Sequence, residues 1–230
     1  MFNHRPVSNA RFSNKSRFGG TSRFGGGRGG FRGRGLPVVP IQSFIRKASV
    51  QVPAQPVVAP TVSIETLLID QKLKNNIMSR GYKLLMPIQE KAIPSILEGK
   101  DVIGIANTGT GKTAAFLIPI IQHVIENPNY KTLIITPTRE LALQIQEELR
   151  RFTQGIRLNS TFCIGQSSMR NQIYDLRRNP HVVIGTPGRL KDLIERRILN
   201  LSVFSMIVLD EVDQMLDMGF INDVKHIISF

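Results

Sequence analysis

A glycine-rich loop that ends in a lysine is the segment of this chain best suited to chemistry. Ala106–Thr113 reads Ala-Asn-Thr-Gly-Thr-Gly-Lys-Thr and follows the apolar run Asp101–Ile105. Glycines let a backbone curl round phosphate oxygens with its amide hydrogens inward, in front of a helix N-terminus. Lys112 supplies a charge for the β and γ phosphates, and Thr113 supplies a hydroxyl for magnesium. The loop predicts a nucleoside triphosphate site, although an ordinary strand-to-helix turn has similar residues.

A second element, Asp210-Glu211-Val212-Asp213, carries acids directly after the apolar run Ser205–Leu209. Carboxylates in this position lie at the carboxyl end of a predicted strand, where ligands of open α/β sheets bind. One acid can hold a metal ion while the other orients a water molecule. An acidic pair alone is usually a solvated cap of the next helix. Together with the glycine loop, in this order, it indicates one site for a magnesium-bound nucleotide.

The elements that must position these residues alternate along the chain from about residue 65 onward. Apolar runs bounded by turn residues alternate with segments of helical period, which predicts an α/β fold with a parallel sheet covered by helices on both faces. Apolar stripes such as Leu141, Ile145 and Leu149 are expected in the core. We expect strands near residues 101–106, 131–136, 160–164, 181–185 and 204–210.

Charge separates the first 64 residues from the rest. The net charge is +13, and residues 1–64 hold 10 of the 30 Lys and Arg but none of the 17 Asp and Glu. So basic a segment implies a polyanionic partner, and nucleic acid is the first candidate. Cys163 is the only cysteine, which excludes an intrachain disulfide and favours a reducing, cytoplasmic location. The longest apolar stretch, Ala114–Ile121, is far short of the roughly 20 residues of a membrane helix, so no membrane partner is expected.

Residues 1–35 are predicted to be a disordered Arg/Gly/Phe tail, because they cannot bury a core. Arg-Phe pairs recur every six residues from Arg11 to Phe24, and an Arg/Gly run follows. Arginine and phenylalanine together suit phosphate pairing and base stacking, so we expect nonspecific RNA contacts; a merely solubilising extension is the alternative. The tail's glycines disfavour an organelle-import helix. Residues 36–63 are expected to be a Pro-rich linker, in which apolar residues at 41–48 follow helical spacing that chance explains equally well.

With further motifs, residues 64–230 resemble the first RecA-like domain of DEAD-box RNA helicases. Ala106–Thr113 matches motif I of that family, and Asp210–Asp213 matches motif II with valine in place of alanine. The stretches Pro137–Ala142 and Thr186–Arg189 resemble motifs Ia and Ib, and Gly165-Gln166 stands where the family has two glycines. Upstream, Gly81-Tyr82 and Pro87-Ile88-Gln89 resemble the adenine-reading Q motif. Ile64, Leu85 and Met86 depart from its usual residues.

The resemblance implies roles for individual residues. Lys112 would grip the β and γ phosphates, Thr113 and Asp210 would hold Mg²⁺, and Glu211 would position or deprotonate the attacking water; Lys112, Asp210 and Glu211 are thus the candidate catalytic residues. The expected ATP-binding residues are Tyr82, Gln89, Thr108, Gly109, Thr110, Gly111, Lys112 and Thr113. The expected contacts to single-stranded or duplex RNA are Pro137, Thr138, Arg139, Gly165, Thr186, Gly188 and Arg189.

The same resemblance predicts that the RecA-like domain is incomplete. The chain stops at Phe230, before a counterpart of the family's S-A-T motif and second RecA-like domain. The S-A-T strand would lie between the glycine-loop strand and the motif II strand, so we expect a marginal or aggregation-prone product and a longer natural protein. Without the second domain's arginine finger, the expected RNA-stimulated ATPase would be nearly inactive. The alternative is a noncatalytic ATP- and RNA-binding module; a DNA-directed helicase fits the motifs less well.

Overall fold

The computed structural model of the chain describes residues 62–230. The predictions for the tail (residues 1–35) and for nearly all of the linker (residues 36–63) therefore lie outside the described residues. Within 62–230, no helix is both long enough and apolar enough to cross a membrane.

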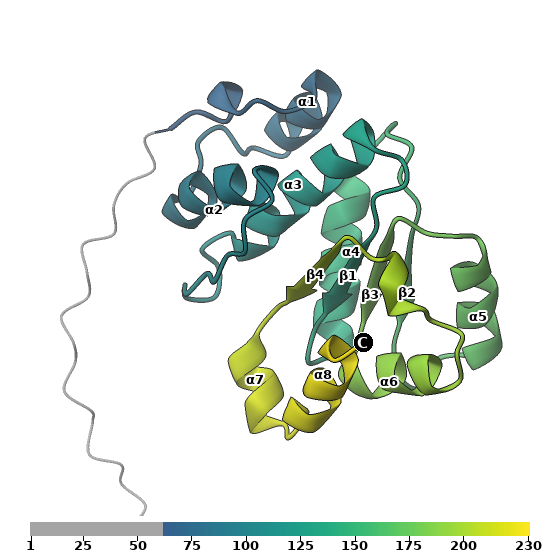
Figure 1. The fold of residues 1–230 in the computed structure, drawn as a ribbon. Coiled ribbons are helices and arrows are strands. Elements are labelled where there is room, and N and C mark those ends of the chain that lie inside the picture. The colour runs from purple at the N-terminus through teal and green to yellow at the C-terminus, as the bar shows by residue number, and fades with distance from the viewer. Residues whose placement is uncertain (1–61) are drawn as a thin grey trace, which may run out of the picture. The chain divides into compact units, whose positions relative to one another are not determined.

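A parallel sheet of four strands forms the centre of the described part (Figure 1). Its strands are β1 (Thr132–Ile135), β2 (Ser160–Cys163), β3 (Val182–Gly185) and β4 (Met206–Leu209). The order across the sheet is β2-β3-β1-β4. All three pairings are parallel, with Ile134 of β1 opposite Ile184 of β3 and Val208 of β4. The predicted α/β class and four of the five predicted strands are confirmed.

Helices fill the intervals between strands, and their ends follow local signals in the sequence. Thr138 caps α4, because its hydroxyl accepts a hydrogen bond from the amide of Leu141. Pro187 occupies the first turn of α6, where a missing N–H has no cost. The α-helices are α1 (Gln71–Ser79), α2 (Pro87–Leu97), α3 (Lys112–Glu126), α4 (Arg139–Phe152), α5 (Met169–Arg177), α6 (Pro187–Glu195), α7 (Val212–Asp217) and α8 (Ile221–Ile228). Two short 3₁₀ helices span Ile64–Thr66 and Leu201–Val203.

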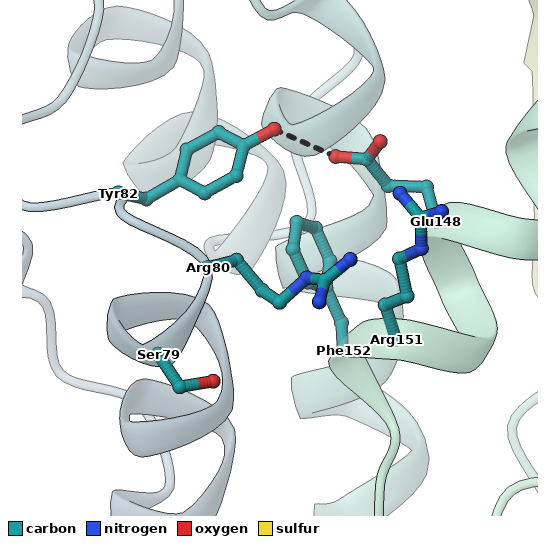
Figure 2. A pocket seen from close by; sticks show the side chains of 6 residues that line it. All are labelled: Ser79, Arg80, Tyr82, Glu148, Arg151 and Phe152. Atoms are coloured by element: carbon teal, nitrogen blue, oxygen red, sulfur yellow. Dashed lines mark hydrogen bonds between the residues drawn. The ribbon is translucent and has the colours of Figure 1, made fainter.

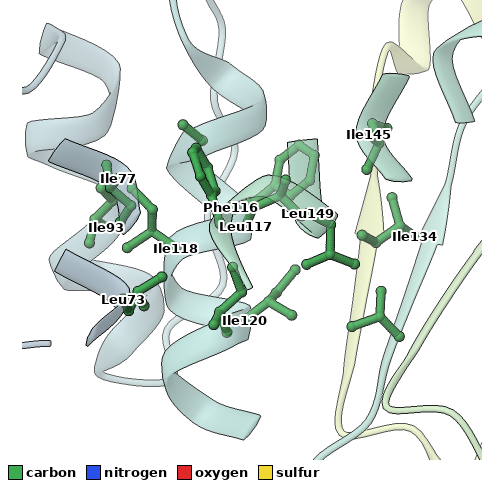
Figure 3. Packing of buried hydrophobic residues seen from close by; sticks show 14 of the residues in the cluster. Leu73, Ile77, Ile93, Phe116, Leu117, Ile118, Ile120, Ile134, Ile145 and Leu149 are labelled. Atoms are coloured by element: carbon green, nitrogen blue, oxygen red, sulfur yellow. The ribbon is translucent and has the colours of Figure 1, made fainter. Parts of the chain in front are cut away.

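Two apolar cores lie on opposite faces of the sheet, because successive strand residues point to alternate faces. Ile134 of β1 belongs to the core that contains side chains of α1, α2, α3 and α4 (Figure 3). Its neighbours Leu133 and Ile135 belong to the other core, with side chains of α6 and α8. Leu141, Ile145 and Leu149 of α4 lie in or against the first core, as predicted. Helices thus cover both faces of the sheet, and the carboxyl ends of its parallel strands lie along one edge.

The predicted strand at residues 101–106 is wrong. This segment has no regular structure, and the side chains of Ile103 and Ile105 are 93% and 94% exposed. Apolar content is not enough for a strand, because its backbone groups also need a hydrogen-bonded neighbour. Among the described residues, β4 pairs only with β1 and leaves its other edge without a strand. The glycine loop is therefore not preceded by a strand, and it leads directly into helix α3.

Candidate nucleotide site and nucleic-acid interface

The glycine loop wraps round the side chain of Lys112. Gly111 has a left-handed backbone (φ 86°, ψ 24°) and forms the N-cap of α3, so the helix begins at Lys112. The Lys112 Nζ atom donates a hydrogen bond to the Ala106 carbonyl oxygen at 2.7 Å. The Thr110 hydroxyl donates to the Asn107 carbonyl oxygen, also at 2.7 Å. A helix N-terminus and an ammonium group thus meet at one loop, which is an arrangement suited to an anion.

Gln89 supports this loop from helix α2. Its side chain is only 1% exposed. The Gln89 Nε2 atom donates to the Gly111 carbonyl oxygen at 3.1 Å, and Gln89 Oε1 accepts from the Met86 amide at 3.0 Å. A Cβ atom at Gly111 would lie 2.4 Å from Gln89 Nε2, so a larger residue at this position would displace the Gln89 amide. The structure therefore brings the predicted adenine-binding glutamine together with the predicted phosphate loop.

The two acids follow β4 directly. Asp210 is buried, and its amide donates to the Ile135 carbonyl oxygen of the neighbouring strand at 2.9 Å. Burial raises the pKa of the Asp210 carboxyl, and the nearby Glu211 charge raises it further, whereas the Lys112 charge lowers it. Glu211 has a left-handed backbone (φ 51°), a strained conformation that clusters at functional sites in non-glycine residues. The Lys112 charge thus acts on the Asp210 carboxyl, as the prediction of one shared site requires.

Only a few side chains here could bind a metal ion, and their donor atoms are oxygens. Thr113, the second residue of α3, carries a hydroxyl, and Asp210, directly after β4, carries a carboxylate. Within residues 62–230, no cluster of three or more His, Cys, Asp or Glu residues could bind a metal by itself. Magnesium keeps several waters and uses one or two carboxylates together with substrate phosphates, so this donor set fits it.

Tyr82 makes side-chain contacts with helix α4. Its hydroxyl donates to Glu148 Oε1 of α4 at 2.8 Å, and its ring packs edge-on against Phe152 with 5.7 Å between centroids (Figure 2). Burial and the Glu148 carboxylate raise the pKa of Tyr82 to about 12. These contacts identify Tyr82 as a packing residue between the end of α1 and α4. The stacking of Tyr82 on adenine stays a prediction.

The predicted RNA residues gather at the carboxyl ends of three strands. Pro137, Thr138 and Arg139 follow β1, Gly165 follows β2, and Thr186, Gly188 and Arg189 follow β3. Because β3 lies between β1 and β2, the loops after these strands are neighbours. A Cβ atom at Gly165 or Gly188 would meet no atom within 4 Å, so the backbone there is open to approach. The structure thus brings both predicted RNA motifs to one edge of the sheet.

Two glutamines that the sequence did not predict as site residues bind the two arginines of this edge. Arg139 Nη1 donates to Gln166 Oε1 at 2.6 Å. Arg189 Nη1 donates to Gln172 Oε1 at 2.8 Å, and the buried Gln172 amide also donates to the Ile164 carbonyl oxygen at 2.9 Å. Gln172 carries no sequence signal beyond its place on an amphipathic helix. Gln166 was visible only as the residue that replaces a glycine of the family pattern.

Comparison with known proteins shows which family the chain resembles. The family described as DEAD/DEAH box helicase matches residues 86–230. The chain is 49% identical over 162 residues to the ATP-dependent RNA helicase CshA of Limosilactobacillus reuteri, covering 70% of this chain and 33% of that protein. It is 48% identical over 158 residues to the pre-mRNA-processing ATP-dependent RNA helicase PRP5 of Meyerozyma guilliermondii, covering 65% of this chain and 18% of that protein.

Solved structures show the same fold. A DEAD box protein from the hyperthermophile Methanococcus jannaschii has a TM-score of 0.70 and 38% identity, covering 74% of this chain and 47% of its own. A hypothetical ATP-dependent RNA helicase from Sulfolobus tokodaii has a TM-score of 0.65 and 37% identity, covering 70% of this chain and 47% of its own. The chain thus spans a third or less of the two curated relatives and about half of these structures. By its matching family and its fold, the chain belongs to the DEAD/DEAH box helicase family.

Proposed function

We propose that this chain is the ATP-binding, RecA-like part of a DEAD-box RNA helicase, in which ATP hydrolysis is coupled to RNA binding and duplex remodelling. The observation that carries the proposal is the glycine loop at the N-terminus of α3, which holds the Lys112 ammonium group, together with Asp210 directly after β4. The names of the relatives, ATP-dependent RNA helicases, agree with it. RNA and ATP are the proposed partners of the folded part.

On the nucleotide side, Lys112 would leave the Ala106 carbonyl oxygen and bind the β and γ phosphates. Thr113 and Asp210 would hold Mg²⁺, which when bound neutralises phosphate charge. A cation also offsets the unfavourable burial of the Asp210 charge, which supports this residue as a metal ligand. Glu211 would orient the attacking water and accept its proton at the carboxylate. Gln89 is already fixed beside the phosphate loop, where its amide suits the edge of an adenine ring.

On the RNA side, the residues after β1 and β3 would contact the sugar-phosphate backbone. Arg139 and Arg189 supply positive charge, whereas Thr138 and Thr186 supply hydroxyls at the N-termini of α4 and α6. Helix N-termini favour phosphate groups. Contacts of this kind position a strand without reading its bases, so we expect weak dependence on RNA sequence.

A lysine pair tests the nucleotide site. Lys112→Ala should weaken Mg·ATP binding by at least about tenfold, since it removes a charge-assisted contact to the phosphates. Lys91→Ala is the matched control, because Lys91 is an exposed residue of α2 that loses the same charge. Titration with a fluorescent ATP analogue, with and without Mg²⁺, measures both variants. Equal affinities for the two variants would contradict the assignment of this site.

The catalytic role of Glu211 needs a separate measurement. Glu211→Gln keeps the size of the side chain but removes its ability to accept a proton. We expect Mg·ATP affinity within about twofold of the unsubstituted chain, because the residue does not bind the phosphates. In a protein that also carries the second RecA-like domain, RNA-stimulated ATP turnover should fall to background. Normal turnover in that protein would rule out Glu211 as the catalytic carboxylate.

A further inference from the structure

A side-chain hydrogen bond from Arg139 to Gln166 joins the arginine after β1 to the loop after β2. We propose that Gln166 is a positioning residue that holds the Arg139 guanidinium ready for an RNA phosphate without neutralising its charge. This inference rests on the proposed RNA-binding function and deepens it, because it concerns a residue at which this chain departs from the double glycine of the family. Its evidence comes from the geometry of three neighbouring loops.

The contact itself is short and neutral. Arg139 Nη1 donates to Gln166 Oε1 at 2.6 Å, and among residues 62–230 Arg139 forms no ion pair with a carboxylate. The Arg139 Nε atom is buried and has no hydrogen-bond partner there. A guanidinium group has five N–H donors in a fixed fork, so one bond to an amide oxygen fixes its orientation and leaves other donors for a phosphate.

The backbone of Gln166 shows that this contact is built into the loop. Gln166 has a φ of 56°, in the left-handed region that non-glycine residues rarely adopt. Strained residues of this kind persist where the surrounding structure requires them, most often at ligand-binding sites. Glycine would adopt the same conformation freely. The presence of a glutamine here therefore calls for a role of its side chain, and the bond to Arg139 supplies one.

The second arginine of the edge is held in the same way. Arg189 Nη1 donates to Gln172 Oε1 at 2.8 Å and to the Ser167 carbonyl oxygen at 3.4 Å. These acceptors, like Gln166 Oε1, are uncharged. The loop after β2 is thus bonded to an arginine on each side, and both arginines keep their full charge. A carboxylate at either position would orient the guanidinium equally well but would cancel the attraction for phosphate.

The test compares variants of the full chain in binding a fluorescently labelled single-stranded oligouridylate, measured by anisotropy over a range of salt concentrations. Gln166→Glu should weaken binding about tenfold and lower the salt slope by about 0.7, the value for one lost phosphate contact on a single strand. Gln144→Glu is the charge-matched control, because Gln144 is exposed on α4. It should change the affinity less than about threefold.

Two further variants separate positioning from a merely structural role. Gln166→Gly removes the amide and the backbone strain together, so RNA binding should weaken about threefold while the melting temperature stays equal or rises. In an Arg139→Ala background, Gln166→Glu should weaken RNA binding no more than Gln144→Glu does, because the guanidinium that the new carboxylate would neutralise is absent.

Equal effects of Gln166→Glu and Gln144→Glu would overturn the inference while leaving RNA binding intact. A loss of RNA affinity of about tenfold on Gln166→Glu in the Arg139→Ala background would also overturn it. If the unsubstituted chain bound no RNA, the proposed function and this inference would both fall.

Discussion

The fit of Gly111 against Gln89 gives a prediction whose size follows from the structure. Gly111→Ala places a Cβ atom 2.4 Å from Gln89 Nε2 and 3.3 Å from Gln89 Cδ. Gln89 is 1% exposed and cannot easily move away. The same substitution also forces an alanine into a left-handed backbone, since φ at this position is 86°. We therefore expect Gly111→Ala to destabilise the chain through two separable effects.

The two effects have different sizes. A left-handed backbone costs an L-residue about 1–2 kcal/mol. Displacing the Gln89 amide breaks its bond to the Gly111 carbonyl oxygen and leaves a buried donor unpaired, at about 1–3 kcal/mol. The sum is about 2–5 kcal/mol. For a folded part of this length, each kcal/mol lowers the melting temperature by about 2–4 °C.

Gly109→Ala is the matched control for the backbone effect. Its φ is 82°, but a Cβ atom there meets nothing within 4 Å. Urea unfolding followed by circular dichroism should place Gly109→Ala about 1–2 kcal/mol below the unsubstituted chain and Gly111→Ala lower by a further 1–3 kcal/mol. In a Gln89→Ala background the extra cost should disappear, because the clashing amide is absent.

Equal destabilisation by the two alanine variants would refute this reasoning. So would an extra cost of Gly111→Ala that survives in the Gln89→Ala background. Either result would mean that Gln89 does not pack against the loop as the structure has it. The nucleotide site would then lack the support from α2 that the structure gives it.

Two further predictions concern the buried Asp210 carboxyl and the partly buried Tyr82 hydroxyl. Asp210→Asn should stabilise the chain at pH 7, because the raised pKa of Asp210 disfavours its charged form in the folded state. This gain should shrink as the pH falls through the raised pKa and vanish below the ordinary value of 3.8, where the folded and unfolded forms are both largely protonated. A less stable Asn variant at pH 7 in urea unfolding would contradict the burial argument. Tyr82→Phe removes the bond to Glu148 and should lower stability by about 0.5–1.5 kcal/mol, whereas a tenfold loss of ATP-analogue affinity would show that Tyr82 contacts the nucleotide.

The sequence predicted the parts of the fold that depend on local pattern. Strands β1 and β3 are buried throughout, so their apolar runs stand out between turn residues. Helix α4 was expected from an apolar stripe that includes Ile145 and Leu149, and both are fully buried. Lys112 and Asp210 were also predictable, because a glycine loop before a helix and acids after a strand carry strong signals. In these cases the residues and their nearest neighbours in the chain contain the information.

The remaining features depend on which distant segments meet. Residues 101–106 are apolar enough for a strand, yet strand formation requires a hydrogen-bonded neighbour that a local pattern cannot reveal. Tyr82 stands seven residues before Gln89, but its hydroxyl finds Glu148 on α4. Gln172 of α5 binds Arg189 of α6, 17 residues further along the chain, because the strands before these helices, β2 and β3, are neighbours in the sheet. Only the three-dimensional arrangement identifies these partners.

The outer edge of β4 has a consequence for how this chain behaves in solution. Its four residues Met206, Ile207, Val208 and Leu209 include neither a charge nor a proline, the features that usually discourage sheet edges from joining. Ile103 and Ile105 add exposed apolar side chains to the described part. At higher protein concentration, copies of the chain should therefore associate and form aggregates. Light scattering during a dilution series would reveal the concentration below which single molecules are studied.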